Sequence, residues 1–501
     1  MTLKRQVASG LFWVSLAQFA GRGLSFATTL ILAKLLSPAL FGLVGMAGLA
    51  IAALQFFQDI GFDAALVYRK DSVEEASHTA FITVILTSFG IYLVAVLTAP
   101  LVADFFRQPD VVPILRVLAL TVPISSFGRV PYILLSRELN FRRKIFPELA
   151  ANVIGNLAAI GLALAGVGVW SLVWGQIIRA TLMTILVWFV SPWRPRLQFE
   201  MRLAREMFQY GKHIVSSQTL IFFITNVDNA IVGRYAGQEA LGLYQFSYNL
   251  SNTPATQINT VFSQVMFPAF SRLSGESAGE ARARYYLTTV RYVSWLTIPL
   301  AIGTILFAPA FIYGLYGNAW AAAIVPLQIL AIYGLVRSIA ANMGSIFRAM
   351  GKPQWLTYIA TWRLITMLIL LIPVTTRWGI IGVSVLSAVV AIVDFVISAN
   401  LVGRLVDAPW RAYARLLLPT GGAALVAGFV AFALYPYMAL GRTAVRLLAA
   451  GVVMAVLYAA LLWLVDPILR STARMGVRQG RRLWRERQAG QMVGAGSGPV
   501  E

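Results

Sequence analysis

Long apolar stretches alternate with short polar segments along the whole chain. An α-helix needs about 20 apolar residues to cross the hydrocarbon core of a bilayer, and a window of that length predicts fourteen transmembrane helices here. The eighth is polar over residues 247–260, which favours a position lining a cavity over one facing lipid. The predicted helices cover residues 10–33, 41–62, 79–103, 113–135, 146–166, 169–190, 213–233, 242–266, 287–308, 323–345, 355–374, 379–401, 413–434 and 443–465.

The composition agrees with an all-α integral membrane protein. Of the 501 residues 58% are hydrophobic and 12% charged, with a mean hydropathy of +0.74. Soluble domains carry a charged fraction of roughly 25%. The chain has no cysteine, and His78 and His213 are its two histidines. Disulfides, thiolate chemistry and histidine-based metal or Ser/His sites therefore have little to build on, and we expect no enzyme activity, no cofactor and no metal.

The loops orient the chain. With fourteen helices, the loops on one side hold 28 Lys and Arg residues and those on the other side five. Cytoplasmic loops are the basic ones, so both termini are predicted to be cytoplasmic. The net charge of +21 is then loop charge, and no nucleic-acid partner is expected. Residues 199–212 and 470–487 are basic and amphipathic, which predicts helices lying on anionic membrane lipids. The last residues, 489–501, are expected to be disordered.

The sequence repeats itself at an offset near 200. The segment LAKLLSPALFGLVG (32–45) aligns with VGRYAGQEALGLYQ (232–245), which puts Lys34 on Arg234 and Gly42 on Gly242. At slightly larger offsets PILRVLAL (113–120) aligns with PLQILAI (326–332), and GVWSL (168–172) with GVSVL (382–386). Six helices separate equivalent points, and an even number returns the chain to the same side of the membrane. The repeat predicts two parallel six-helix lobes around a central cavity.

This repeat also sets the expected domain boundaries. Residues 1–198 form the N-terminal lobe with helices 1–6, and residues 199–410 form the C-terminal lobe with helices 7–12. The second lobe begins with the interfacial amphipathic segment. Residues 411–466 add helices 13 and 14, and residues 467–501 form a basic cytoplasmic tail.

Several predicted helices carry a charged residue near the middle. Such a charge costs about 2.5–3.5 kcal/mol on insertion, so it usually faces protein or a watery interior. Most of these charges are arginines, which favours an anionic cargo. The mid-helix charges are Arg22, Arg116, Arg129, Arg179, Asp228, Arg337, Arg363 and Asp394.

Three segments resemble the polysaccharide transporter family. They are the opening residues 9–47 with FFQDIGFDAALVYR (56–69), the element NVDNAIVGRYAGQEALGLYQFSYNL (226–250), and GVGVWSLVWGQIIRA (166–180). Members of that family are lipid-linked oligosaccharide flippases, in the superfamily that also holds multidrug antiporters and the lipid II flippase. The resemblance implies alternating-access transport of an undecaprenyl-pyrophosphate-linked oligosaccharide across the bacterial inner membrane, for exopolysaccharide, capsule or O-antigen (lipopolysaccharide) biosynthesis. Polysaccharide polymerase and export machinery are candidate partners.

The candidate site residues follow from charge and position. Arg22 comes first, because a guanidinium can bind a pyrophosphate in a bidentate manner; the alternative is a structural ion pair with Asp228 or Asp59. Structural pairing of Asp394 with Arg363 is equally open. Arg179 and Arg291 lie closer to helix ends and rank lower. The substrate-binding candidates are Arg22, Arg116, Arg129, Arg337, Arg363, Tyr244, Tyr248 and Asn249, and the ion-coupling candidates are Asp228, Asp394 and Asp59.

Other functions fit the sequence less well. A cation-coupled drug antiporter of the same fold is the alternative, and it predicts a smaller cavity dominated by carboxylates. A membrane-embedded glycosyltransferase or polymerase would need a large loop outside the membrane, whereas the longest predicted connection has about 20 residues.

Overall fold

The computed structural model describes residues 21–58, 66, 69, 71–137, 141–272, 279–438 and 441–470, and these residues form helices and connecting turns without a strand. Ten helices of this part are long and apolar enough to cross a membrane. The chain is therefore a multi-pass, all-helical membrane protein.

The ten apolar helices and the fourteen predicted ones differ in three places. Only residues 21–33 of the first predicted helix are described. The seventh and eighth both fall in α9 (Met201–Arg272), which is too polar to count by hydropathy. The eleventh and twelfth are joined in α13 (Gln354–Val406), which counts as one span. The number fourteen stays a prediction.

Glycines interrupt both of these long helices. Gly237 in α9 has φ 88° and Gly379 in α13 has φ 57°, a region that side-chain-bearing residues rarely adopt. Across Gly237, Tyr244 hydrogen-bonds to Asp228 at 2.8 Å, whereas sixteen residues of straight helix would extend about 24 Å. The two parts of α9 are therefore antiparallel neighbours.

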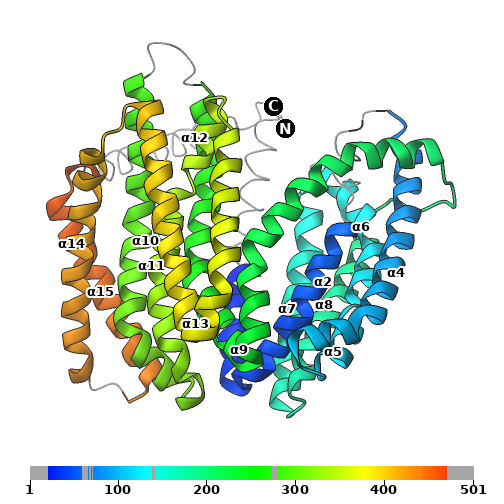
Figure 1. Cartoon of the computed structure of the whole chain (residues 1–501), viewed down its shortest axis with the longest axis horizontal. Helices are drawn as coiled ribbons and strands as arrows, with labels where there is room; N and C mark the ends of the chain where they lie inside the picture. Colours follow the sequence, from blue (N-terminus) through cyan, green and yellow to red (C-terminus); the bar gives the residue numbers. More distant parts are fainter. Residues whose placement is uncertain are drawn as a thin grey trace, which may run out of the picture.

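The helices before α9 form one group, called here the N-terminal group (Figure 1). Glycines allow close packing inside it: a methyl group on Gly155 would lie 3.0 Å from the carbonyl oxygen of Gly175 on the next helix. Small residues let membrane helices approach in this way. The group contains residues 21–35, α2 (Pro38–Gln58), α4 (Val73–Phe106), α5 (Val111–Leu118), α6 (Thr121–Arg137), α7 (Phe141–Leu164) and α8 (Val169–Val190).

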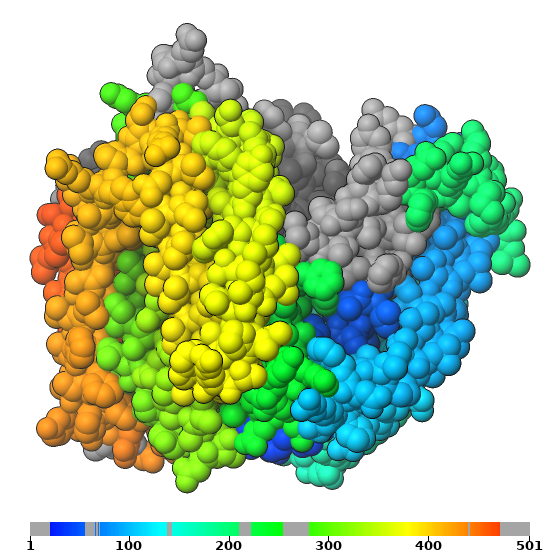
Figure 2. Space-filling model, viewed as in Figure 1, coloured from blue at the N-terminus to red at the C-terminus, as the bar shows by residue number. Residues whose placement is uncertain are grey.

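The helices from α10 onward, with the second part of α9, form the C-terminal group. Figure 1 shows that the two groups meet at the bottom of the view and lean apart toward the top, and the space-filling surface is indented between them (Figure 2). Helices α14 and α15 pack on α10, at the outer side of this group. Its elements are α10 (Gly279–Leu315), η2 (Asn318–Ala323), α11 (Ile324–Ala340), α12 (Met343–Ala349), α13, α14 (Trp410–Leu434), η3 (Tyr435–Tyr437) and α15 (Thr443–Val465).

The two groups meet where α2 crosses the second part of α9. A methyl group on Gly42 would lie 1.7 Å from the carbonyl oxygen of Gln238, and one on Gly242 would lie 1.9 Å from that of Pro38. The two contacts are reciprocal at an offset of 200 residues: 42 meets 238, and 242 meets 38. A two-fold axis produces this pattern at a self-complementary interface, so the contact supports the internal repeat.

Loops that the charge pattern placed on one side also meet in space. Arg137 donates hydrogen bonds to the carbonyl oxygens of Leu66 and Arg69, at 2.6 and 2.5 Å. Arg69 in turn pairs with Glu206 at 3.0 Å. At the opposite end of α4, Arg234 donates to the carbonyl oxygen of Asp104 at 2.8 Å. These contacts agree with the predicted sidedness of those loops.

The segment predicted to lie on the lipid surface forms the first turns of α9. Its apolar side chains Leu203 and Met207 are buried in a cluster with Val130 and Ile133 of α6. Protein therefore covers Leu203 and Met207, whereas the apolar side chains of Phe199, Met201 and Phe208 are exposed, so contact of this segment with lipid stays a prediction. The second amphipathic segment, 470–487, lies outside the described residues except for Arg470.

Candidate functional site

The C-terminal group contains a buried network of charges and tyrosines. In α9 the Tyr244 hydroxyl donates to Oδ2 of Asp228 at 2.8 Å, and the backbone N–H of Asn229 donates to Oδ1 at 2.8 Å. Tyr244 itself is fully buried. The glycine break at Gly237 makes this contact possible, because it brings residues 228 and 244 to the same level.

Tyr333 of α11 is the centre of this network. Its hydroxyl oxygen accepts hydrogen bonds from Arg337 at 2.7 Å and from Arg363 of α13 at 3.1 Å. The Tyr248 hydroxyl lies 3.5 Å from the same oxygen. Tyr333 was not among the sequence-based candidates, although its place four residues before Arg337 puts both on one helix face.

The carboxylates of Asp228 and Asp394 lie close enough to the two arginines to interact with them electrostatically. Arg363 is near both carboxylates, and Arg337 is near Asp394. Opposite charges near each other offset part of the cost of placing them in a membrane. Oδ1 of Asp394 makes no hydrogen bond within the described part of the chain, so its structural pairing with Arg363 stays a prediction.

The N-terminal group holds a cavity of about 540 Å³. Residues of α2, α6, α7 and α8 line it, among them Gly48 and Ala180, together with Leu118 at the C-terminal end of α5. Cavities of this size commonly take small ligands. Its polar lining consists of Gln55, Thr121, Ser125, Tyr132, Glu148, Asn152, Gln176 and Arg179.

Hydrogen bonds connect neighbouring helices around this cavity. The Tyr132 hydroxyl donates to Glu148 at 3.4 Å, and Arg179 donates to the side-chain oxygen of Asn152 at 3.3 Å. Lys144 lies over the Tyr132 ring, with its Nζ 4.5 Å from the ring centre. Gly155 allows the Arg179 backbone to come close, since a methyl group there would lie 2.6 Å from Cβ of Arg179.

The sequence ranked Arg179 low as a helix-end residue, and the structure places it in the cavity lining. Glu148, Asn152 and Gln176 were missed. A usable signal was present, since 148 and 152 are four residues apart in one apolar helix and 176 and 179 are three apart in the next. Such spacings put polar side chains on one helix face.

The remaining candidates are dispersed. Arg22 follows Gly21, which lies against Asn152: a methyl group on Gly21 would be 3.7 Å from Asn152 Nδ2. Arg22 and Arg116 are exposed, and Arg129 is half-buried; Arg116 and Arg129 are not among the residues lining the cavity. Asn249 is exposed. Asp59 lies outside the described residues.

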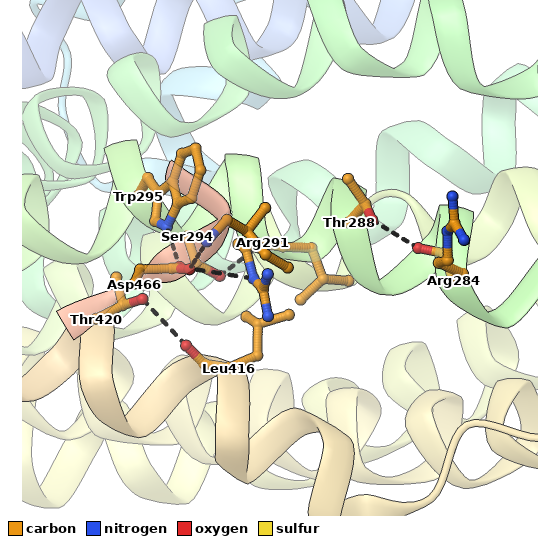
Figure 3. Close-up of polar contacts among 10 residues, drawn as sticks. Arg284, Thr288, Arg291, Ser294, Trp295, Leu416, Thr420 and Asp466 are labelled. Carbon is orange, nitrogen blue, oxygen red and sulfur yellow. Dashed lines mark hydrogen bonds and ion pairs between the residues drawn. The ribbon is translucent and has the colours of Figure 1, made fainter. Parts of the chain in front are cut away.

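Arg291, also ranked low, forms an ion pair away from both sites. Its Nε lies 3.7 Å from Oδ2 of Asp466, to which Trp295 also donates at 3.2 Å (Figure 3). Tyr458 of α15 donates to the carbonyl oxygen of Trp295 at 2.9 Å. These contacts fasten α15 and the residue after it to α10, which is a structural role.

Comparison with known proteins places the chain in a family. Residues 31–325, more than half of the chain, match the family described as polysaccharide biosynthesis protein. The chain belongs to this family. The polysaccharide biosynthesis family match includes α2 to α10 and so contains the N-terminal cavity and the crossing at Gly42.

Individual relatives cover most of the chain. The teichuronic acid biosynthesis protein TuaB of Bacillus subtilis is 26% identical over 434 residues, which are 86% of this chain and 89% of that protein. The succinoglycan biosynthesis transport protein ExoT of Rhizobium meliloti is 27% identical over 330 residues, 66% of each chain.

Solved structures share the fold. The lipid II flippase MurJ in an inward closed conformation aligns with a TM-score of 0.72 at 14% identity, covering 90% of this chain and 98% of that one. An inward-facing multidrug resistance MATE family transporter of the MOP superfamily aligns with a TM-score of 0.60 at 15% identity, covering 79% and 98%. At such identities the likeness concerns the fold alone.

Proposed function

We propose that this protein is a flippase that moves an undecaprenyl-pyrophosphate-linked oligosaccharide repeat unit across the bacterial inner membrane. The product would serve exopolysaccharide, capsule or O-antigen synthesis, with the polymerase and export machinery as partners. Membership of the polysaccharide biosynthesis family, by residues 31–325, carries this proposal. A polar cavity among membrane-spanning helices supports it, because a glycan needs hydrogen-bonding groups that lipid does not offer.

The proposed movement is alternating access between two lobes. We infer fourteen helices in total, with two parallel six-helix lobes, α14 and α15 appended, and both termini cytoplasmic. The reciprocal contacts of Gly42 and Gly242 support the relation between the lobes. The lobes would rock about this crossing, where a backbone–backbone contact leaves little room for sliding.

Arg22 is our first candidate for the pyrophosphate. It belongs to the N-terminal group and directly follows Gly21, which lies against Asn152 of the cavity lining. Arg337 and Arg363 donate instead to Tyr333, so a structural role is favoured for them. Arg116, Arg129 and Asn249 stay candidates for the cargo, and Asp228, Asp394 and Asp59 for a coupling ion.

A vesicle assay tests the proposal. The protein is reconstituted into liposomes with lipid-linked oligosaccharide extracted from its own host, and periodate, applied outside, oxidises the glycans of the outer leaflet. A flippase exposes the inner-leaflet glycans as well, so oxidation goes nearly to completion. If oxidation stops at the level of protein-free vesicles, the proposed function is wrong.

The alternative is a cation-coupled small-molecule or drug antiporter, which the fold shared with the MATE transporter supports. Such an antiporter is expected to present unpaired carboxylates in its cavity. The described cavity contains a single carboxylate, Glu148, among amides, hydroxyls and Arg179. Drug tolerance that changes on deletion of the gene, with normal surface polysaccharide, would favour the antiporter.

A further inference from the structure

The N-terminal cavity contains more hydrogen-bonding side chains than packing requires. We propose that it is a sugar subsite, in which a neutral pyranose ring of the cargo glycan binds while the pyrophosphate stays outside. This inference rests on the proposed transport of a lipid-linked glycan, and it assigns the glycan to one half of the molecule.

The lining matches the chemistry of a sugar. Each sugar hydroxyl donates one hydrogen bond and accepts others, and amide side chains offer both functions. Asn152 on α7 and Gln176 on α8 supply the amides, and Glu148 and Arg179 supply an acceptor and a fork of donors. Gln176 and Arg179 are both exposed, so their polar groups can reach a ligand.

The charge balance favours a sugar over a pyrophosphate. The lining holds one acidic residue, Glu148, and one basic residue, Arg179, so it offers no excess of positive charge to a pyrophosphate. A sugar hydroxyl can donate to Glu148 and accept from Arg179. Arg22, next to the contact of Gly21 with Asn152, provides the cation near the cavity for the phosphate groups.

The empty space depends on small residues at defined positions. Gly48 lines the cavity, and a methyl group there would meet nothing within 4 Å. At the repeat offset of 200, Gly48 corresponds to Tyr248. The segments GVWSL and GVSVL align at an offset of 214, and at that offset Ala180 corresponds to Asp394. In the C-terminal group these larger side chains belong to the charge network, so less room is left at the matching positions of the described residues there.

Filling the cavity gives a direct test. Gly48→Leu places a side chain into it, and Gly90→Leu on the exposed surface of α4 is the matched control, since a methyl group there also meets nothing within 4 Å. The probes are the free oligosaccharide, released from the host lipid by mild acid, and undecaprenyl pyrophosphate without a glycan. Binding of each is measured with purified full-length protein in detergent, together with thermal unfolding.

We expect Gly48→Leu to weaken binding of the oligosaccharide by at least roughly tenfold, the size of a lost hydrogen-bonded contact. Binding of undecaprenyl pyrophosphate should stay unchanged, and Gly90→Leu should change neither. If Gly48→Leu does not fold, Gln176→Leu, which keeps the volume and removes the amide, should give the same selective loss.

Three results would overturn the inference. In the first, the variants weaken both probes equally, which would make the cavity a pyrophosphate site. In the second, wild-type protein moves the lipid-linked cargo in vesicles but the free oligosaccharide does not bind; the subsite is then wrong and the transport function stands. In the third, wild-type protein moves no cargo, and both proposals fall.

Discussion

The two halves of this protein use equivalent interior positions in opposite ways. In the N-terminal group Gly48 and Ala180 border a polar cavity of about 540 Å³. In the C-terminal group Tyr248 and Asp394 stand at the matching positions and join a network around Tyr333 with Arg337 and Arg363. Where the predicted repeat aligns the two groups, small residues therefore border a cavity in one group and larger side chains join a polar network in the other.

The difference also separates two kinds of charge within the membrane-spanning helices. Arg363 is half-buried and donates a hydrogen bond to the buried Tyr333. Arg179 donates to Asn152 but has an exposed side chain in the lining of a cavity. We interpret the first as part of the scaffold and the second as available to cargo.

The largest effect is expected at the crossing that relates the halves. Gly42→Ala and Gly242→Ala each push a methyl group into a backbone carbonyl, at 1.7 and 1.9 Å from the oxygen. Both variants should lose most of their folded, monodisperse protein in size-exclusion chromatography, and to a similar degree. Gly90→Ala is the control and should behave as wild type; normal yields for one of the two crossing variants would contradict their equivalence.

The second effect concerns the charge network. Arg363→Leu removes the hydrogen bond to Tyr333 and a positive charge near Asp394, and leaving a buried polar group without its partner costs about 1–3 kcal/mol, more when the group is charged. Thermal unfolding should shift down clearly, and the double variant Arg363→Leu/Asp394→Leu should regain part of the loss. Arg179→Leu, the counterpart in the cavity, should unfold close to wild type while transport decreases. Equal destabilisation by both arginine variants would remove the distinction drawn here.

The third effect is expected on transport and not on the stability of the protein. Arg22→Ala should abolish complementation of a flippase-null strain because it removes the cation proposed for the pyrophosphate, one residue from the contact of Gly21 with the cavity-lining Asn152, while the protein amount in membranes stays normal. Arg442→Ala, a basic residue at the start of α15, serves as control and should complement. Full complementation by Arg22→Ala would show that Arg22 does not bind the cargo.

The smallest effect is expected from one hydroxyl of the network. Tyr244→Phe removes the 2.8 Å hydrogen bond to Asp228, and a lost bond to a charged group is worth about 1.5–3 kcal/mol. Tyr413→Phe, which breaks the 2.9 Å contact between the neutral tyrosines 413 and 286, should cost about 0.5–1.5 kcal/mol. Chemical or thermal unfolding compares the two; a larger loss for Tyr413→Phe would mean that Asp228 is not held by Tyr244.

Much of the helix pattern could be predicted from the sequence. The predicted spans 169–190 and 443–465 coincide with α8 and α15, because a long apolar run can satisfy its backbone in a membrane only as a helix. The sequence repeat aligns Gly42 with Gly242, the two glycines at which the helices cross. The sequence did not show that Leu203 and Met207 pack on protein, since an amphipathic helix can bury apolar side chains in lipid or in protein.

The candidate site was predicted less completely, for a reason that Arg116 and Arg179 illustrate. Both are arginines in apolar helices, yet Arg179 lines the cavity and Arg116 does not. In a soluble helix the apolar stripe indicates which side faces inward. In a membrane helix the lipid-facing side is apolar as well, so the sequence carries little information on how each helix is rotated.

The sequence alone therefore determined that this chain crosses the membrane many times, and it predicts that its loops have a preferred side and that its two halves are related. Those properties depend on the hydropathy and charge of consecutive residues. Only the tertiary structure decided that Asp228 meets Tyr244, that Arg363 meets Tyr333, and that Glu148, Asn152, Gln176 and Arg179 surround one cavity. Such contacts join residues distant in the chain, and the packing and rotation of the helices bring them together.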